Sequence, residues 1–419
     1  MPATVDFNYS YQNIFSRYVD DASFLWILRT IAVKQPNYSK DDIAELERRI
    51  EYNLDGLMSS MDLGWRVCES ALAMGESGEV FTAAVTAFKS HEVKKIELVV
   101  DAGLQDDQTF KGLVSALAWL TAELVNPWVN KFLISKNLDH KYLGLAVCSV
   151  RRHDVGDYLA RILFRDDCQQ HKKLYARALR LIGELRRQDL MPALKQAISS
   201  DDRDVAFWAN WSAILLGNRS AVNNIKGYLL NGEAHQRRAI HIAFRVLPVD
   251  QARQWISEMA KDETLGRAVI QATAVLGDPH AVNWLIQKMK EPASARVAGE
   301  AITMITGIDL IQHRLTKAMP VNLESMPNDS VDDDNVTMDE DDKLPWPDAE
   351  KITMFWQQQG RNFIIGQRYF MGQLISTPWL LKLLEHANQR QRCAAALELA
   401  LTDPAHGFYN TQGRVLQHE

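Results

Sequence analysis

The residues with the clearest capacity for chemistry in this 419-residue chain are arginines, several of them adjacent in the sequence. Pairs stand at Arg151-Arg152, Arg186-Arg187 and Arg237-Arg238. A planar guanidinium binds a carboxylate through two parallel hydrogen bonds, so exposed arginines suit an acidic protein partner. The structural alternative for such pairs is a solvated turn or helix start. The candidate partner-binding residues are Arg152, Arg187, Arg219, Arg237, Arg238, Arg245, Arg368 and Arg390.

Sequence motifs for catalysis and for cofactor or metal binding are missing. The chain contains no Gly-rich phosphate loop, no GxSxG elbow and no HExxH metal helix, and His91-Glu92 is its only interior His-Glu pair. A di-iron hydroxylase built from helical pairs would need several such His-Glu pairs facing one another. No CxxC spacing occurs among the four cysteines, Cys68, Cys148, Cys168 and Cys393. We therefore expect no catalytic residue, no cofactor and no metal.

Charge and aromatic spacing argue against nucleic-acid binding. The chain has 47 Lys and Arg against 53 Asp and Glu, a net charge of −6, whereas a nucleic-acid binder normally carries a strongly basic surface. A helical-repeat DNA glycosylase would need aromatic side chains that trap a displaced base. The best candidates lie at helical spacing among Leu, Ile and Ala, which favours core packing: Trp208, Trp211, Trp255 and Trp284.

An acidic stretch interrupts the chain between Glu324 and Glu350. It holds 11 acids and one Lys, and few apolar residues that could anchor it. Such a stretch repels itself and cannot offset its ordering entropy by burial, so we predict a flexible loop over residues 311–350. An EF-hand calcium site is excluded because the glycine and the distal glutamate are missing. The opposite charges suggest that this loop masks an arginine surface in the free protein.

A repeat of about 30 residues organises the rest. Alanines recur in apolar helical segments at spacings of 32, 30, 30, 33, 30, 29 and 30: Ala84, Ala116, Ala146, Ala176, Ala209, Ala239, Ala268 and Ala298. A second landmark recurs at Leu194, Ile225, Ile256 and Leu285. Turns such as Leu276-Gly277-Asp278-Pro279 fall between the two landmarks. Each unit is therefore a helix, a tight turn and a second helix, and the pattern resembles the short HEAT type of α-solenoid.

These patterns predict an all-α protein with four regions. Residues 1–65 form an N-terminal helical segment, 66–310 a HEAT-like repeat array, 311–350 the acidic loop and 351–419 a C-terminal helical cap. Within the cap, we expect a sharp connection at Gly366–Gly372, where Arg368 answers a helix C-terminus. The first residues lack the basic segment and apolar run of a signal peptide, and no uncharged apolar stretch is long enough to span a membrane. We expect a soluble cytoplasmic protein without membrane contact.

Short motifs along almost the whole chain resemble an uncharacterised bacterial HEAT-repeat family. The N-terminal motifs are Phe24-Leu25-Trp26, Arg29, Pro36, Leu46, Asp55-Gly56-Leu57 and Gly64-Trp65. The C-terminal motifs match more strongly, and they are Thr306–Leu310, Leu344–Asp348, Gly366–Gly372 and Arg390–Leu399. The long, irregular acidic stretch after Asp309 departs from that family's pattern.

Genes of that family often lie beside type VI secretion components, especially spike proteins of the VgrG and PAAR kinds and their effectors. The resemblance implies an accessory role, as a non-catalytic adaptor or chaperone that binds a spike protein or effector, and it brings no catalytic residues. Two alternatives remain open. One is a HEAT-like enzyme or lyase that cradles a small molecule, and the other is an immunity protein that binds an effector.

Overall fold

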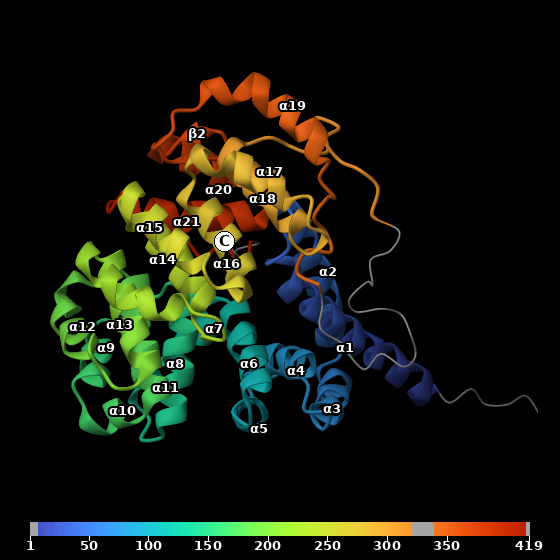
Figure 1. Ribbon diagram of the computed structural model, residues 1–419. Helices are drawn as coiled ribbons and strands as arrows, with labels where there is room; N and C mark the ends of the chain where they lie inside the picture. The colour runs from blue at the N-terminus through green and yellow to red at the C-terminus, as the bar shows by residue number, and fades with distance from the viewer. Residues whose placement is uncertain (1–6, 321–338, 416–419) are drawn as a thin grey trace, which may run out of the picture. The chain divides into compact units, whose positions relative to one another are not determined.

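The computed structural model of the protein describes residues 7–320 and 339–415. Over these residues the chain forms 21 α-helices, five short 3₁₀-helices and one two-stranded hairpin. Helices adjacent in sequence pack in pairs, as Figure 1 shows for α16, α17 and α18, which is consistent with a helical repeat. The predicted all-α class is confirmed. Among the described helices, none is both long and apolar enough to cross a bilayer.

Two compact units divide the described chain. The first contains residues 7–34, 38–212 and 407–415, and the second contains 35–37, 213–320 and 339–406. Helix α13 (Arg203–Leu215) passes from one to the other. These bounds differ from the predicted region boundaries, because the division follows packing rather than the repeat and because the last described residues return to the first unit.

The first unit is built from twelve α-helices before α13 and one 3₁₀-helix. They are α1 (Phe7–Ala32), α2 (Lys40–Met58), α3 (Met61–Leu72), α4 (Ser77–Ser90), α5 (Val93–Gly103), α6 (Asp107–Trp119), α7 (Ala122–Ile134), α8 (Leu138–Arg151), α9 (Asp157–Leu163), α10 (Asp166–Gln170), α11 (Lys172–Glu184), η1 (Gln188–Leu190) and α12 (Met191–Ala197). Ser39 caps α2 through a capping box with Asp42, in which each residue's side chain binds the other's main-chain N–H.

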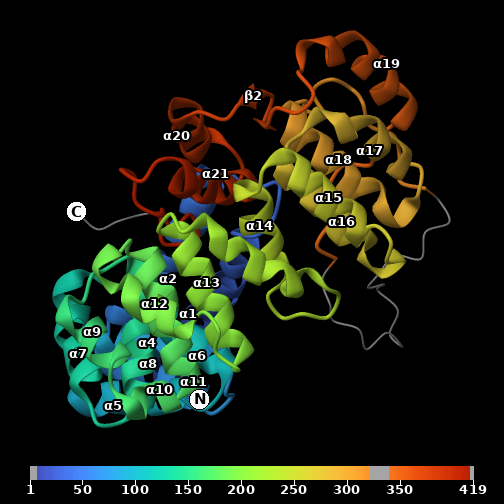
Figure 2. The same ribbon diagram turned by 60° about the vertical axis from the view of Figure 1, so that its left-hand side comes forward.

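The second unit continues with shorter elements, seen from another side in Figure 2. They are η2 (Arg219–Leu229), α14 (Gln236–Val246), α15 (Val249–Met259), η3 (Glu263–Leu265), α16 (Gly266–Leu276), η4 (Pro279–Ala281), α17 (Val282–Lys288), α18 (Pro292–Thr306), α19 (Ala349–Gln359), η5 (Gly360–Asn362), β1 (Tyr369–Phe370), β2 (Gln373–Leu374), α20 (Thr377–His386) and α21 (Gln389–Thr402). One predicted second helix, around Ile225, is a 3₁₀-helix instead.

The repeat alanines occupy equivalent buried positions. All eight are at most 7% exposed, and they lie in α4, α6, α8, α11, α13, α14, α16 and α18. In the first unit α4 packs on α6, α6 on α8 and α8 on α11; in the second, α14 packs on α16 and α16 on α18. A side chain no larger than a methyl group at these positions lets neighbouring helices approach closely. Trp208, Trp211 and Trp255 are buried as expected, whereas Trp284 is 36% exposed.

A β-hairpin replaces the sharp connection predicted at Gly366–Gly372. Tyr369 pairs with Leu374, and the turn residues Met371 and Gly372 both have positive φ, 51° and 82°. The hairpin lies against the C-terminal ends of α16 and α18. The N–H of Tyr369 donates to the carbonyl of Gly277 (2.8 Å), and that of Met371 donates to Met304 (2.7 Å). Carbonyls that lack partners at these helix ends are thereby satisfied.

The described ends of the acidic stretch are anchored, so the predicted flexible loop is wrong there. Thr316 forms an antiparallel bridge with Pro347, and the N–H of Lys317 donates to Trp346 (3.0 Å). Leu344 and Asp341 are buried. The stretch has few apolar residues, but ion pairs to Arg267 and Arg296, which are distant in the sequence, hold its acids in place. The central part of the predicted loop, residues 321–338, lies outside the described residues.

Candidate functional site: an arginine cluster in the second unit

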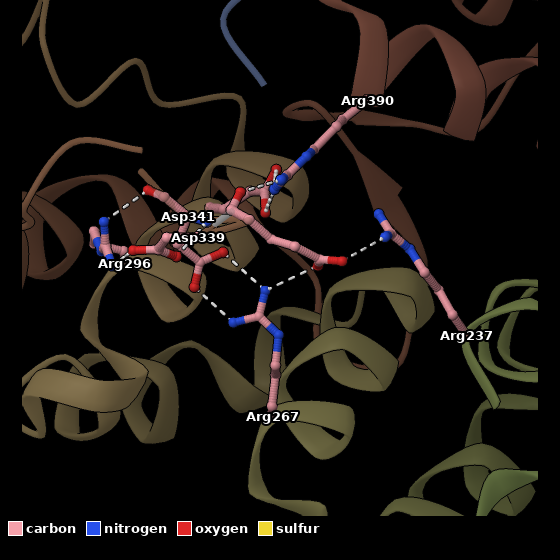
Figure 3. Close-up of polar contacts among 8 residues, drawn as sticks. Arg237, Arg267, Arg296, Asp339, Asp341 and Arg390 are labelled. Carbon is pink, nitrogen blue, oxygen red and sulfur yellow. Dashed lines mark hydrogen bonds and ion pairs between the residues drawn. The ribbon is translucent and has the colours of Figure 1, made fainter. Parts of the chain in front are cut away.

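Four arginines near the starts of four helices converge on one acidic segment in the second unit. We call Arg237, Arg267, Arg296 and Arg390 the arginine cluster, and residues 339–341 the acidic segment. The four side chains come from α14, α16, α18 and α21 and approach the segment from different sides (Figure 3). Three of the four are the second residue of their helix.

The position of these arginines is not explained by helix stability. A helix carries partial positive charge at its N-terminus, which disfavours a cation in its first turn and favours an anion there. An arginine near the start of each of four helices therefore needs a compensating anion. Asp339, Glu340 and Asp341 supply it in this structure.

Arg267 makes the most complete pairing. Its Nη1 and Nη2 lie 2.6 Å and 2.8 Å from Oδ2 and Oδ1 of Asp341, a bidentate geometry, and Nη2 lies 3.5 Å from Oε2 of Glu340. Two parallel hydrogen bonds fix the orientation of the carboxylate as well as its position. Asp341 is only 5% exposed, whereas the Arg267 side chain is 41% exposed, so the carboxylate is buried and the guanidinium still contacts water.

Arg296 and Arg390 bind the acidic segment on either side of that pair. Nη2 of Arg296 lies 2.5 Å from Oδ2 of Asp339, and its Nη1 donates to the main-chain carbonyl of Asp341 (3.0 Å). Arg390 binds Glu300 with both carboxylate oxygens (2.8 and 3.0 Å), and its Nη2 donates to the main-chain carbonyl of Glu340 (2.5 Å). The cluster therefore binds main-chain carbonyls of the segment in addition to its carboxylates.

The outer edge of the cluster is open to solvent. Nη1 of Arg237 lies 3.5 Å from Oε1 of Glu340, and both side chains are more than half exposed. At that exposure and distance the attraction is weak and screened by salt. The site thus has a buried anchor at Asp341 and an accessible, loosely paired edge at Arg237 and Glu340.

Charge pairing governs the protonation of the anchor. Burial alone would raise the pKa of Asp341, but hydrogen bonds and charge from Arg267, with further charge from Arg390 and Arg296, leave its pKa below the usual 3.8. The hydrogen bonds to Asp341 raise the pKa of Arg267 in turn. Both groups are charged at neutral pH, so Asp341 accepts and Arg267 donates the hydrogen bonds between them.

A buried ion-pair network lies in the same unit and contains two of the predicted binding residues. Arg245 and Arg368 both pair with Glu398. Nε of Arg245 lies 3.2 Å from Oε2 of Glu398, and Nη1 and Nη2 of Arg368 lie 2.9 and 2.8 Å from its two carboxylate oxygens. Burial lowers the pKa of Arg245 to about 10, with the charge of Glu398 opposing that effect. Burial and the charge of Arg245 also lower the pKa of His241, so this histidine is neutral. Arg245 is 6% exposed and cannot contact a partner, so its prediction as a binding residue is wrong.

Arg368 fulfils its other predicted role. Its Nε donates to the carbonyl of Leu276, the last residue of α16, at 3.1 Å, and its Nη1 donates to the carbonyl of Arg245 at 2.8 Å. The expectation that Arg368 answers a helix C-terminus is confirmed. These contacts connect the hairpin, α14, α16 and α21, so we assign Arg368 to the stability of the unit.

The remaining predicted residues lie apart from the cluster. Arg152 and Arg187 belong to the first unit, where Arg152 pairs with buried Glu184 (3.4 Å) and Arg187 with Asp189 (2.7 Å). Arg219 and Arg238 are exposed in the second unit, at the start of η2 and in α14. Of the eight predicted arginines, the structure brings Arg237 and Arg390 to the arginine cluster and Arg245 and Arg368 to Glu398.

Arg267 and Arg296 were not predicted from the sequence, although their spacing from Arg237 follows the period of the repeat. Arg237, Arg267 and Arg296 are 30 and 29 residues apart, which is the period of the alanine landmarks. An arginine that recurs with the repeat must occupy the same edge of successive helical pairs. Adjacent arginine pairs do not follow this period, so they did not indicate Arg267 or Arg296.

No protein-family model, curated protein or solved structure matches the chain. The assignment of the site therefore depends on its geometry alone. Within residues 7–320 and 339–415, no group of three or more His, Cys, Asp and Glu side chains could hold a metal ion. What the cluster offers is a row of fixed guanidinium groups for carboxylates on an extended acidic segment.

Proposed function

We propose that this protein is a non-catalytic, HEAT-type α-solenoid scaffold whose arginine cluster binds an acidic segment of a partner protein. The observation that carries the proposal is the convergence of Arg237, Arg267, Arg296 and Arg390 on residues 339–341. Paired helices, a period of about 30 residues and the buried alanines support the solenoid.

The proposed partner is a spike protein of the VgrG or PAAR kind, or an effector, of type VI secretion. Support comes from the resemblance of the sequence motifs to a family that accompanies those components. The C-terminal motifs also lie together in the second unit. Arg368 of one motif binds Glu398 of another, and a Cβ on Gly307 would lie 2.6 Å from the carbonyl oxygen of Met371. In this proposal the protein acts as an adaptor or chaperone in the cytoplasm, without nucleic acid or membrane.

The acidic segment has the role of an internal competitor in this proposal. It presents to the cluster the same groups that a partner's acidic segment would present, namely carboxylates and main-chain carbonyls. A partner must displace at least its exposed edge, Glu340, to reach Arg237 and Arg267. The affinity measured for a partner is then reduced by the fraction of molecules in which the cluster is occupied.

Co-purification tests this proposal. The tagged full-length chain, expressed in cells with an active type VI system, should capture a VgrG, PAAR or effector protein identified by mass spectrometry. Arg237→Glu should reduce the capture at least tenfold, because a charge reversal at the exposed edge repels an acidic partner. Arg219→Glu is the matched control, since Arg219 is exposed in the same unit but outside the cluster.

The outcomes separate the proposal from its alternatives. Equal capture by wild type and Arg237→Glu would remove the arginine cluster from the interface. Absence of every spike and effector protein would overturn the proposed partner class. Circular dichroism of each variant should match the wild type, because Arg237 is about half exposed and its ion pair with Glu340 is weak. Poisoning of cells on deletion of the gene, with secretion intact, would instead identify an immunity protein.

A further inference from the structure

An irregular segment near the C-terminus packs against helices of the first unit and is held there largely through its main chain. Residues 407–415, which we call the C-terminal segment, contain no helix or strand and follow α21 of the second unit along the chain. Their contacts are nevertheless with the first unit. The surface that receives them, which we call the segment site, includes Arg29, Glu47, Glu51, Trp119, Val150, Arg152 and Trp211.

The segment site contacts the main chain of the C-terminal segment at both ends and in between. Nε of Arg152 donates to the carbonyl of Phe408 (2.9 Å). One nitrogen of Arg29, Nη2, donates to the carbonyls of Gln412 (3.2 Å) and Gly413 (2.7 Å). The carboxylate of Glu47 accepts the N–H of Val415 with both oxygens, at 2.9 and 3.0 Å. Contacts of this kind recognise an extended backbone whatever its side chains.

Three side chains of the segment add specificity. The ring centres of Phe408 and Trp211 lie 5.8 Å apart, and the guanidinium of Arg152 lies 5.1 Å from the ring centre of Phe408. Nδ2 of Asn410 donates to the carbonyl of Val150 (2.8 Å). Arg414 lies over the ring of Trp119 at 4.6 Å and donates to its carbonyl at 2.7 Å. By contrast, Tyr409 is 47% exposed.

The segment crosses the ends of successive repeat helices. Asn410 binds a carbonyl in the last turn of α8, and Arg414 binds the carbonyl of the last residue of α6. Helix C-terminal carbonyls lack partners within the helix and carry partial negative charge, so amide and guanidinium donors suit them. The main-chain carbonyls at the C-terminal ends of α6 and α8, two helices that pack on each other, thus each provide one contact to the segment.

The charged pair at the centre of the site is costly as a purely structural device. Arg29 and Glu47 form an ion pair of 2.7 Å, and their side chains are 7% and 0% exposed. Desolvation of two charges commonly costs as much as their attraction returns, and apolar residues of similar size would stabilise the interior at least as well. The pair does supply a donor and an acceptor fixed at the spacing of a peptide backbone.

We infer that the segment site is a binding site for a peptide of a partner protein that has no helix or strand and turns as residues 410–413 do, and that the chain's own C-terminal segment occupies it in cis. The peptide carries an aromatic residue six positions before an arginine, as Phe408 and Arg414 do, with Asn two positions after the aromatic. The segment has no helix or strand to lose on leaving, and its one turn is closed by the N–H of Gly413, which donates to the carbonyl of Asn410 (3.2 Å). Exchange with a partner peptide that forms the same turn breaks only the contacts that the peptide remakes. This site lies in the first unit and does not depend on the arginine cluster.

A competition experiment with the full-length chain tests the inference. The probe is a fluorescein-labelled synthetic peptide of residues 407–415, capped at its C-terminus so that no extra charge lies beside Glu47. Its binding is followed by fluorescence anisotropy. Arg414→Ala weakens the internal competitor and should tighten binding of the probe at least tenfold relative to wild type. Glu47→Gln in the same background should weaken it at least tenfold, because the acceptor of the Val415 N–H loses its charge.

Controls on both molecules separate recognition from misfolding. Tyr409→Ala in the chain, at an exposed position of the segment, should leave probe binding as in the wild type. A probe in which the residues matching Phe408 and Arg414 are alanine needs no protein variant and should bind the Arg414→Ala chain at least tenfold more weakly than the original probe.

Three results would overturn the inference. The first is the same affinity for the original and the alanine probe, and the second is the absence of binding to the Arg414→Ala chain. The third is a wild-type chain that is dimeric by light scattering and dissociates when the probe is added, since that would assign the site to the segment of a second copy.

Discussion

Arg368 and Glu398 form a bidentate ion pair inside the second unit, with Nη1 and Nη2 of the arginine 2.9 and 2.8 Å from the two carboxylate oxygens. Arg368 precedes the hairpin, Glu398 lies in α21, and Arg245 of α14 binds the same carboxylate at 3.2 Å. One buried carboxylate thereby connects three segments that are distant in the sequence. The arginine cluster is built on two of the same helices, α14 and α21.

Removal of the Glu398 charge should destabilise the second unit strongly. Glu398→Gln leaves Arg245 and Arg368 buried without their anion, and breaking such a pair costs about 3–5 kcal/mol. Urea unfolding followed by circular dichroism measures the change. Asp107→Asn removes the exposed partner of Lys173 and should leave the unfolding midpoint unchanged. Equal midpoints for the two variants would show that the buried network does not stabilise the unit.

The glycines at the two repeat turns should differ in their tolerance of a side chain. Gly217 and Gly277 both have positive φ, 96° and 74°, so alanine costs about 1–2 kcal/mol of backbone strain at either site. A Cβ on Gly217 meets open space, whereas one on Gly277 would overlap the carbonyl oxygen of Tyr369. Gly277→Ala should therefore lower the free energy of unfolding by more than Gly217→Ala. A smaller loss for Gly277→Ala would contradict the packing of the hairpin on α16.

Acid should release the acidic segment. The pKa of Asp341 is lower in the folded protein than its ordinary 3.8, so its pairing stabilises the protein above that pH and is lost as pH falls through the lowered folded value. Wild type should thus exceed Asp341→Asn in unfolding free energy at pH 7, and the difference should shrink below pH 3.8. A difference that stays constant from pH 7 to pH 2.5 would refute the charge pairing. Urea titrations at each pH provide the measurement.

The cysteines should differ in reactivity according to burial. Burial raises the pKa of the Cys68 and Cys148 thiols to about 12, and it also raises the pKa of Cys168, whereas Cys393 is partly exposed. The thiolate is the reactive form, so a thiol reagent at pH 8 should modify Cys393 first and the other three only in denaturant. Cys393→Ser should abolish the fast reaction. Rapid modification of more than one thiol in the native wild type would contradict the described packing.

How much the sequence could predict depends on whether a feature is local or periodic. The Ser39 cap could be predicted because a capping box involves only residues 39–42, and the repeat alanines could be predicted because they recur at a regular spacing. The hairpin at Tyr369 could not, because its strands are two residues long and are held by the ends of α16 and α18, which lie about 65 to 95 residues earlier.

The candidate site could be predicted only in part for a related reason. Arg237 and Arg390 could be predicted because they are arginines in polar stretches. Arg245 was predicted on the same ground, but its side chain is buried against Glu398. Burial of an arginine depends on an ion-pair partner that is distant in the sequence, and a local sequence pattern cannot predict that partner. The fixed position of Asp341 could not be predicted for the same reason, since its carboxylate is held by Arg267, which lies 74 residues away in the sequence.

The most direct test of the central claim is the equilibrium dissociation constant of a purified spike or effector partner, measured by titration calorimetry with three forms of the chain. Glu340→Gln weakens the internal competitor at its exposed edge, and Arg267→Ala removes the central guanidinium. We expect Glu340→Gln to bind several-fold tighter than wild type and Arg267→Ala at least tenfold weaker. The same constant for all three forms would show that the arginine cluster is not the binding surface.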